Sequence, residues 1–417
     1  MLFGTNLKYT KAYNYRIVLE TVRLQGPISR ADVARSTELT PQTVSNIARR
    51  LIKANLIMDT DRTREGRGAP ATNLEINPDG AFSIGLDFDQ DHLTGVMIDL
   101  KGVVRERVDY SIRLPMPDVA MDHMEQVVRH LITQHSLQRR NIWGVGIGLP
   151  GPLEIEEGSV VAMKSSPSAL GGWDHVPVAD LMSRRLDLPI YLENNATAAA
   201  IGERWYGEGR EFRTFFYLFF GLGLGGGLII DGHPYEGNSG NAGEIGYVPT
   251  AFPKDHFESF EYPHLGIYFN LPRLYRMLEE AGIRVSDIED LVQLHSDGNP
   301  IVADWISTGG SVLASIVPAI GYLLDPEAIV FGGRLPDQLI DVLMARVRQA
   351  LPEAPVAVKS IAPKLRRGRA GRDATALGVA TLPMYESFAP APNILMKSSG
   401  NGGERPFLSV DQLLLRV

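Results

Sequence analysis

The chain has 417 residues, 44% hydrophobic and 22% charged, which is typical of a soluble globular protein with two or three domains. No window approaches the roughly 18 apolar residues of a membrane span, no signal pattern begins the chain, and the absence of cysteine excludes disulfides and thiolate-bound zinc. We therefore expect a cytoplasmic protein. Residues 1–75 carry an excess of positive charge although the net charge is −8, which favours an anionic partner for that end.

The first 57 residues predict three helices. Apolar spacing predicts the first over 14–26, and Ser29 followed by Asp32 resembles the capping box that begins a second. The third helix begins after Thr40, a good N-cap, with Pro41 at its first position. Its buried stripe falls at i, i+3 and i+7 on Val44, Ile47 and Leu51.

The side chains left on the outside of the third helix are of the kinds that reach phosphates and base edges. Two helices across a tight turn, the second polar outside, predict a helix-turn-helix whose second helix lies in the major groove of DNA. The residues expected to contact DNA from this helix are Pro41, Gln42, Thr43, Ser45, Asn46 and Arg49.

Residues 56–76 predict a strand, a turn and a second strand, which together form a wing. The turn holds Arg64, Arg67 and Gly68, and a slim loop of this kind enters an A·T-rich minor groove, where bulk would clash and arginine is favoured. An ordinary helical hairpin is the alternative. Three helices, a wing and positive charge together favour a DNA-binding domain.

From residue 83 the pattern predicts three strands, a helix near 118–136, and then strands alternating with helices. Each half begins with a meander of strands, which is the duplicated layout of an α/β, two-lobed, actin-like (ribonuclease H-like) sugar-kinase fold. We expect a winged helix-turn-helix domain over 1–78, a first lobe over 79–198, a second lobe over 199–384 and a tail over 385–417.

Several motifs of this body resemble the ROK family, whose name stands for repressor, open reading frame and kinase. They are "GVGIGLPGPLE", "LENNATAAA", "GLGLGGGLIIDGHPYEGNSGNAGEIGY" and "DPEAIVFGG". The turn "GRGAP" resembles the wing of the repressor branch, which includes xylose and N-acetylglucosamine repressors. The resemblance covers about residues 12–383 and implies either a cytoplasmic sugar kinase or a sugar-responsive transcription factor. Kinases of the family usually lack the DNA-binding domain.

Three elements that the resemblance implies for a kinase are missing, although phosphoryl transfer needs positioned phosphates, a metal and a base. The family's first phosphate loop, Asp-x-Gly-Gly-Thr, is replaced by residues 87–91, "DFDQD", whose carboxylates repel a triphosphate; binding of Mg²⁺ is the alternative. The family's catalytic aspartate is replaced by Asn195, which accepts no proton; capping of the next helix is its alternative role. The family's zinc-binding histidine is replaced by Tyr247.

The glycine-rich stretch corresponds by resemblance to the family's second phosphate loop, with Leu222 in place of threonine. We interpret it as a degenerate nucleotide loop retained for a tight turn and lobe packing, with residual ATP binding as the alternative. Its glycines are Gly221, Gly223, Gly225 and Gly226.

Three further segments are interpreted from composition. We expect residues 254–264 to form a solvated acidic loop, with metal binding by His256, Glu258, Glu261 and His264 as the alternative. We expect the basic stretch 364–372 to be a solvated loop, with a second nucleic-acid contact as the alternative. The tail is expected to be a flexible linker followed by a short apolar segment.

Sugar recognition is the property that we expect to survive. By resemblance, Glu244 contacts the sugar, Asn194 and Asn195 lie at the cleft between the lobes, and Gly172 and Trp173 belong to the loop that closes over it. Carboxylates and amides suit the vicinal hydroxyls of a neutral carbohydrate. Hinge packing is the alternative role for these groups.

The sequence thus predicts a DNA-binding repressor of carbohydrate metabolism genes, whose catalytically inactive kinase-like domain senses a sugar or sugar derivative. It predicts no catalytic residue, cofactor or metal. The expected partners are operator DNA, the sugar and further copies of the chain in a homodimer or homotetramer, with no membrane. The first alternative is a working sugar kinase with an appended DNA-binding domain, and the second is a regulator that responds to a protein partner.

Overall fold

The computed structural model describes residues 7–63, 71–112, 116–138, 141–156, 159–163, 173, 176–250, 263–351 and 363–388. The chain divides into two compact units. Unit 1 comprises residues 1–147, 154–192 and 379–417, and unit 2 comprises residues 148–153 and 193–378. The division into four parts that the sequence suggests stays a prediction.

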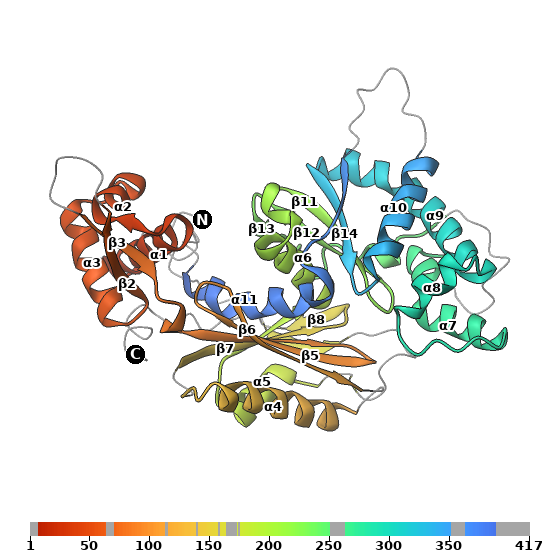
Figure 1. Ribbon diagram of the computed structural model, residues 1–417, viewed down its shortest axis with the longest axis horizontal. Coiled ribbons are helices and arrows are strands. Elements are labelled where there is room, and N and C mark those ends of the chain that lie inside the picture. The colour runs from red at the N-terminus through yellow and green to blue at the C-terminus, as the bar shows by residue number, and fades with distance from the viewer. Residues whose placement is uncertain are drawn as a thin grey trace, which may run out of the picture. The chain divides into compact units, whose positions relative to one another are not determined.

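The N-terminal part of unit 1 is a bundle of three helices with a small sheet (Figure 1). The helices are α1 Leu7–Gln25, α2 Arg30–Thr37 and α3 Pro41–Lys53, and the strands β1 Ile28–Ser29, β2 Ile57–Thr63 and β3 Ala71–Ile76 pair in the order β1-β3-β2. Both predicted caps are present. Ser29 Oγ accepts the N–H of Asp32 at 3.1 Å, and Thr40 Oγ1 accepts the N–H of Thr43 at 3.2 Å. The predicted apolar stripe of α3 is buried.

The remainder of unit 1 is built on a five-stranded sheet in the order β10-β7-β4-β5-β6. Its strands are β4 Phe82–Phe88, β5 His92–Asp99, β6 Val104–Ser111, β7 Ile142–Leu149 and β10 Ile190–Asn194. Strands β4, β5 and β7 are buried along their full lengths. The cause is visible in Figure 1, where α4 Pro117–Gln134 and α5 Val178–Leu186 cover one face, and the unit 1 part of α11 Ala374–Phe388 covers the other. Two short strands, β8 Leu153–Glu156 and β9 Ser159–Met163, pair with each other.

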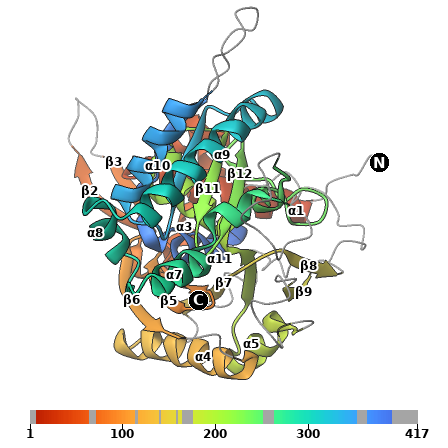
Figure 2. The same ribbon diagram turned by 90° about the vertical axis from the view of Figure 1, so that its right-hand side faces the viewer.

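Unit 2 is built on a second five-stranded sheet, in the order β13-β12-β11-β14-β15. Its strands are β11 Phe215–Phe220, β12 Leu224–Ile230, β13 His233–Pro234, β14 Ala328–Gly333 and β15 Lys364–Arg367. Helix α6 Asn195–Tyr206 packs against β12. Figure 2 shows α9 Pro300–Leu324 and α10 Asp337–Ala350 beside β11, and alternate side chains of β11 join one apolar core with these two helices. Helices α7 Leu271–Glu280 and α8 Asp290–Ser296 pack on α9. Short 3₁₀ helices span Pro78–Gly80, Glu208–Glu211, Ile245–Tyr247, Leu265–Phe269 and Gly371–Asp373.

Helix α9 corrects one expectation from the sequence. By length and composition it is apolar enough to cross a membrane, with a mean hydropathy of 1.4 over an 18-residue window, although no such window was expected. Half of that window is buried, and residues such as Val302, Leu313 and Val317 belong to the core of unit 2. Because the core helix of a globular protein has the same composition, α9 is only a weak indication of a membrane span.

Part of the basic stretch 364–372 forms a strand, where we expected a solvated loop throughout. Its first four residues form β15, which pairs in parallel with β14. Its arginines have carboxylate partners within unit 2: Arg367 pairs with Asp341, Arg369 with Glu208 and Arg372 with Glu289. The arginine side chains of these ion pairs are at least partly exposed, and the alternative, a second contact with DNA phosphates, stays a hypothesis.

Close packing within unit 2 explains part of the glycine-rich hairpin between β11 and β12. A Cβ on Gly226 would lie 2.6 Å from the main-chain oxygen of Gly243, and one on Gly225 would lie 2.9 Å from the Cβ of Ala196 on α6. A Cβ on Gly223 would meet no atom within 4 Å. The packing of unit 2 therefore requires glycine at positions 225 and 226 and not at position 223.

Gly226→Ala and Gly223→Ala form a matched pair that tests this explanation. We expect Gly226→Ala to lower the free energy of unfolding by about 1–3 kcal/mol, because the backbone must move away from Gly243. Gly223→Ala should change it by less than about 0.5 kcal/mol. Urea unfolding followed by circular dichroism measures both variants, and equal losses in the two would contradict the packing explanation.

Candidate functional site

The outer face of α3 carries the side chains that we expect to contact DNA. The exposed ones are Pro41, Gln42, Asn46 and Arg49, and the half-buried ones are Thr43 and Ser45. Asn46 Oδ1 accepts hydrogen bonds from Gln42 Nε2 at 3.2 Å and from Arg49 Nη1 at 3.4 Å. Since these three residues stand at i, i+4 and i+7, they form one polar row along the helix.

Two basic residues that the sequence analysis did not select extend this face. Arg50 and Lys53 lie in the last turn of α3 and are exposed. Contacts with DNA phosphates need only a positive side chain within reach, so both add to the positive charge beside the polar row. The sequence signal for them was the run of two arginines at 49 and 50.

Of the predicted wing, the structure describes only the two strands, β2 and β3. Strands β2 and β3 are antiparallel and pair from Ile57 with Ile76 up to Thr63 with Ala71. Arg64, Arg67 and Gly68, the predicted contacts at the wing tip, lie outside the described residues. Their role stays a prediction.

In unit 2, Asn194 and Glu244, both expected by resemblance at a sugar site, are joined by a hydrogen bond. Asn194 is the N-cap of α6, where its Oδ1 accepts the N–H groups of Ala196 at 2.8 Å and Thr197 at 3.3 Å. Its Nδ2 donates to Glu244 Oε1 at 3.1 Å. The cap therefore fixes the orientation of the amide, and the amide in turn holds the carboxyl group.

Burial changes the acidity of Glu244. Desolvation raises its pKa from 4.5 to about 7, while the hydrogen bond from Asn194 opposes part of that rise. A carboxyl group with this pKa changes its charge near neutral pH. Its ionised form is the stronger acceptor of hydrogen bonds from hydroxyl groups.

Gly151 belongs to the same corner of unit 2, although the sequence analysis did not select it. A Cβ at this position would lie 2.1 Å from Asn194 Nδ2 and 2.6 Å from Glu244 Oε1. Only glycine leaves room for the hydrogen-bonded pair. The sequence signal for this residue was the Gly-Pro turn of "LPGPL".

Asn195 does not cap α6, which corrects the alternative considered for it. The cap is Asn194, and Asn195 is the first residue of the helix. Its main-chain oxygen accepts a hydrogen bond from Thr375 Oγ1 at 3.2 Å, at the start of α11. Its side-chain amide stands where the resemblance places a catalytic aspartate, and an amide is no general base.

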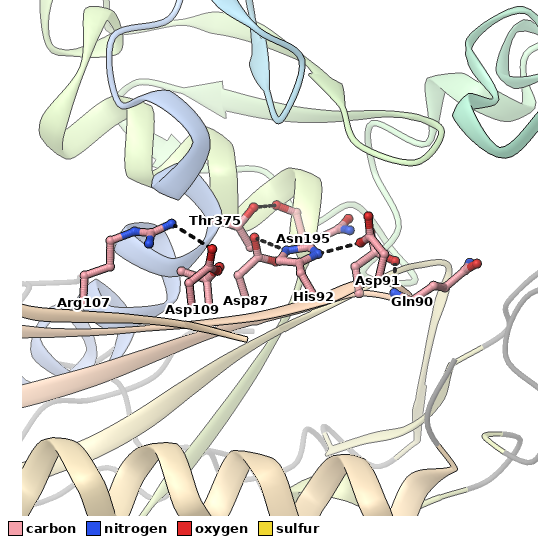
Figure 3. A network of polar contacts seen from close by, with 10 residues as sticks. Asp87, Gln90, Asp91, His92, Arg107, Asp109, Asn195 and Thr375 are labelled. Carbon is pink, nitrogen blue, oxygen red and sulfur yellow. Dashed lines mark hydrogen bonds and ion pairs between the residues drawn. The ribbon is translucent and has the colours of Figure 1, made fainter. Parts of the chain in front are cut away.

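Figure 3 shows the hairpin between β4 and β5, where the resemblance places a phosphate loop. His92 lies between two carboxylates, with Nδ1 2.8 Å from Asp91 Oδ1 and Nε2 3.2 Å from Asp87 Oδ2. The N–H of Gln90 donates to Asp89 Oδ1 at 2.8 Å. This hairpin presents carboxylates where a polyphosphate needs donors. His92 directly follows the aspartates of "DFDQD", and this position was the sequence signal for it.

The remaining predicted residues are placed as follows. Trp173 is 1% exposed, with its ring 5.0 Å from that of Phe88 on β4, so it packs within unit 1. Gly172 lies outside the described residues. A Cβ on Gly221 would lie 2.7 Å from the Phe219 ring, so the backbone at Gly221 is tightly packed.

Metal binding finds no support in the described part of the chain. There, no group of three His, Cys, Asp or Glu side chains is arranged to hold a metal ion. His264 Nδ1 lies 2.8 Å from the main-chain oxygen of Gly246, and its ring stacks on Tyr247. The other members of the proposed metal set, His256, Glu258 and Glu261, lie outside the described residues.

Two repressors are among the similar proteins. The xylose repressor of Bacillus spizizenii is 26% identical over 77% of this chain and 82% of its own length. The N-acetylglucosamine repressor of Escherichia coli O6:H1 is 22% identical over 80% of this chain and 83% of its own length.

Solved structures show the fold. A ROK family transcriptional regulator, described as a homologue of the Escherichia coli Mlc protein, matches with a TM-score of 0.72 and 22% identity over 93% of this chain and 99% of its own. A ROK glucokinase from Streptomyces griseus, solved with glucose and AMPPNP, matches with a TM-score of 0.60 and 22% identity over 72% of this chain and 99% of its own. Residues 83–264 match the sequence profile described as the ROK family. This chain therefore contains a ROK family domain.

Proposed function

We propose that this protein is a DNA-binding transcriptional repressor that responds to a sugar and transfers no phosphate. The observation that carries the proposal is the exposed row of Gln42, Asn46 and Arg49 on a helix-turn-helix that precedes a ROK domain. The xylose and N-acetylglucosamine repressors and the ROK regulator support this combination, because their matches cover between 77% and 93% of the chain.

For DNA recognition, α3 enters the major groove and the polar row faces the base edges. The wing residues Arg64, Arg67 and Gly68 enter the adjacent minor groove. Two copies of the chain, as a homodimer or within a homotetramer in the cytoplasm, bind the two halves of an inverted repeat, because two-fold symmetric proteins bind symmetric operators.

For the sugar, the recognising groups are the amide of Asn194 and the carboxyl group of Glu244. Asn194 Nδ2 is a donor and Glu244 Oε1 an acceptor, and the two atoms lie 3.1 Å apart in a partly desolvated corner. Both groups can replace the hydrogen bond between them by hydrogen bonds to adjacent hydroxyls of the sugar. The fixed orientation of the capping amide lowers the entropy cost of binding.

The absence of phosphoryl transfer rests on two positions. Asn195 cannot accept the proton of an attacking hydroxyl, which costs about 10²–10⁴ in rate where a general base is lost. Asp87 matches the aspartate of the family's phosphate loop, and the β4–β5 hairpin adds the carboxylates of Asp89 and Asp91, of which Asp89 is buried. Charge repulsion there opposes binding of a nucleoside triphosphate.

Asn46→Ala tests the DNA contact. We expect operator affinity to fall about 5- to 150-fold, corresponding to about 1–3 kcal/mol, because one amide in the major groove is lost. The probe is a duplex selected from a randomised pool with the unchanged protein, and fluorescence anisotropy at fixed salt gives the Kd. Gln293→Ala, which removes an exposed amide on α8, is the control. A Kd for Asn46→Ala equal to that of the control would remove α3 from the interface.

The pKa of Glu244 gives a pH test of the sugar site. If the ionised carboxylate binds the sugar, affinity rises with pH, and a pKa of about 7 makes the Kd at pH 6 about tenfold larger than at pH 8. Calorimetry with D-xylose and N-acetyl-D-glucosamine measures this ratio. In Glu244→Gln the ratio should fall to near one. An unchanged pH dependence in that variant would place the sugar elsewhere.

Phosphoryl transfer is tested directly by ADP release in the presence of ATP, Mg²⁺ and glucose, xylose or N-acetylglucosamine. We expect turnover no higher than in a protein-free control. Asn195→Asp should not restore activity by itself, because the carboxylates of the β4–β5 hairpin remain. Turnover by the unchanged protein would instead support the alternative of a sugar kinase with an appended DNA-binding domain.

A further inference from the structure

Arg16 of α1 is a buried guanidinium at which the winged helix meets the rest of unit 1. The residue is 5% exposed, and its Nη1 donates to the main-chain oxygen of Glu386 on α11 at 2.7 Å. Tyr191 on β10 also acts on it electrostatically. Two elements of the body, α11 and β10, therefore reach the same side chain of the DNA-binding part.

Both of these elements lead to the start of α6. Strand β10 ends at Asn194, three residues after Tyr191. Helix α11 is continuous from Ala374 to Phe388, and near its first turn Thr375 donates to the main-chain oxygen of Asn195. Thr375 and Glu386 thus belong to one helix, which also contains Pro383.

A second attachment holds the winged helix at the exit of its wing. Arg105 Nη2 lies 2.9 Å from Asp79 Oδ1, and Lys101 pairs with Glu75. The N–H of Leu100 donates to the main-chain oxygen of Pro78 at 3.2 Å. Because these bonds tie the exit of the wing to the turn between β5 and β6, a displacement at Arg16 would tilt the winged helix about this anchor.

We propose that Arg16 is the positioning residue through which the sugar site controls the winged helix. A sugar held by Asn194 and Glu244 shifts the start of α6, and α11 and β10 carry that shift to Arg16. The orientation of α3 then changes relative to its anchor, and operator affinity changes with it. The inference rests on the proposed function for its biological meaning, but the mechanical link is testable without sugar or DNA.

The first test is a double-mutant cycle read by hydrogen exchange of the full chain. Thr375→Val removes the hydroxyl at one end of α11, and Arg16→Met removes the guanidinium at the other end while keeping an apolar stem. We expect Thr375→Val to change the exchange rate of α1 amides by about 5-fold or more, the low end of allosteric coupling. The change should disappear in the Arg16→Met background and persist with Arg16→Lys.

Thr133→Val is the matched control, because Thr133 Oγ1 donates to the main-chain oxygen of Arg129 on α4, away from α11. The inference would be overturned if Thr375→Val left the exchange rates of the α1 amides unchanged. An equal effect of Thr133→Val, or an undiminished effect of Thr375→Val in the Arg16→Met background, would overturn it as well, because the shift would then be general or would travel by another route.

The second test measures operator affinity with and without D-xylose, D-glucose or N-acetyl-D-glucosamine, using the duplex selected with the unchanged protein. In Arg16→Met the ratio of the two affinities should approach one, while calorimetry gives an unchanged sugar Kd. A ratio like that of the unchanged protein would overturn the role of Arg16. A ratio of one in the unchanged protein would contradict sugar sensing, and hydrogen exchange would still decide the mechanical link.

Discussion

The amide of Asn194 is the group on which the arrangement in unit 2 depends. Its oxygen satisfies two N–H groups that the first turn of α6 leaves without helical partners, and its nitrogen holds Glu244. Gly151 leaves the space that this pair occupies. One side chain thus begins a helix and orients a carboxyl group.

A scaffold shared with kinases can persist without kinase chemistry, because packing and catalysis depend on different atoms. The glycines at 225 and 226 are required by the approach of α6 and Gly243, whatever is bound nearby. The carboxylates beside His92 and the amide of Asn195 set the local charge, while β4 and β5 pair along their whole lengths. The atoms that hold the scaffold together are therefore not those on which phosphoryl transfer would depend.

The N-terminal helical part of unit 1 contacts the rest of that unit at two separate places, one buried and one exposed. The guanidinium of Arg16 contacts α11, and Arg105 and Lys101 hold the exit of the wing. Contacts at both Arg16 and the exit of the wing restrict how the N-terminal helical part can move. A small displacement at one of these two places would then change the orientation of this part in a defined direction.

The sequence by itself determined the local features, because caps, turns and periodicity are properties of neighbouring residues. Ser29, Thr40 and the apolar stripe of α3 are such features, as are the three strands of the meander from Phe82 to Ser111. Resemblance added Asn194 and Glu244, which a hydrogen bond joins, and their role in binding a sugar stays a prediction.

Only the tertiary structure decided what depends on contacts between distant residues. It assigned the cap of α6 to Asn194, made part of the basic stretch 364–372 a paired strand, and buried half of the apolar window of α9. The contact of Arg16 with a helix 370 residues further along the chain has no local signal in the sequence. Periodicity reports which side of an element is apolar, but the identity of its neighbour is a property of the folded chain.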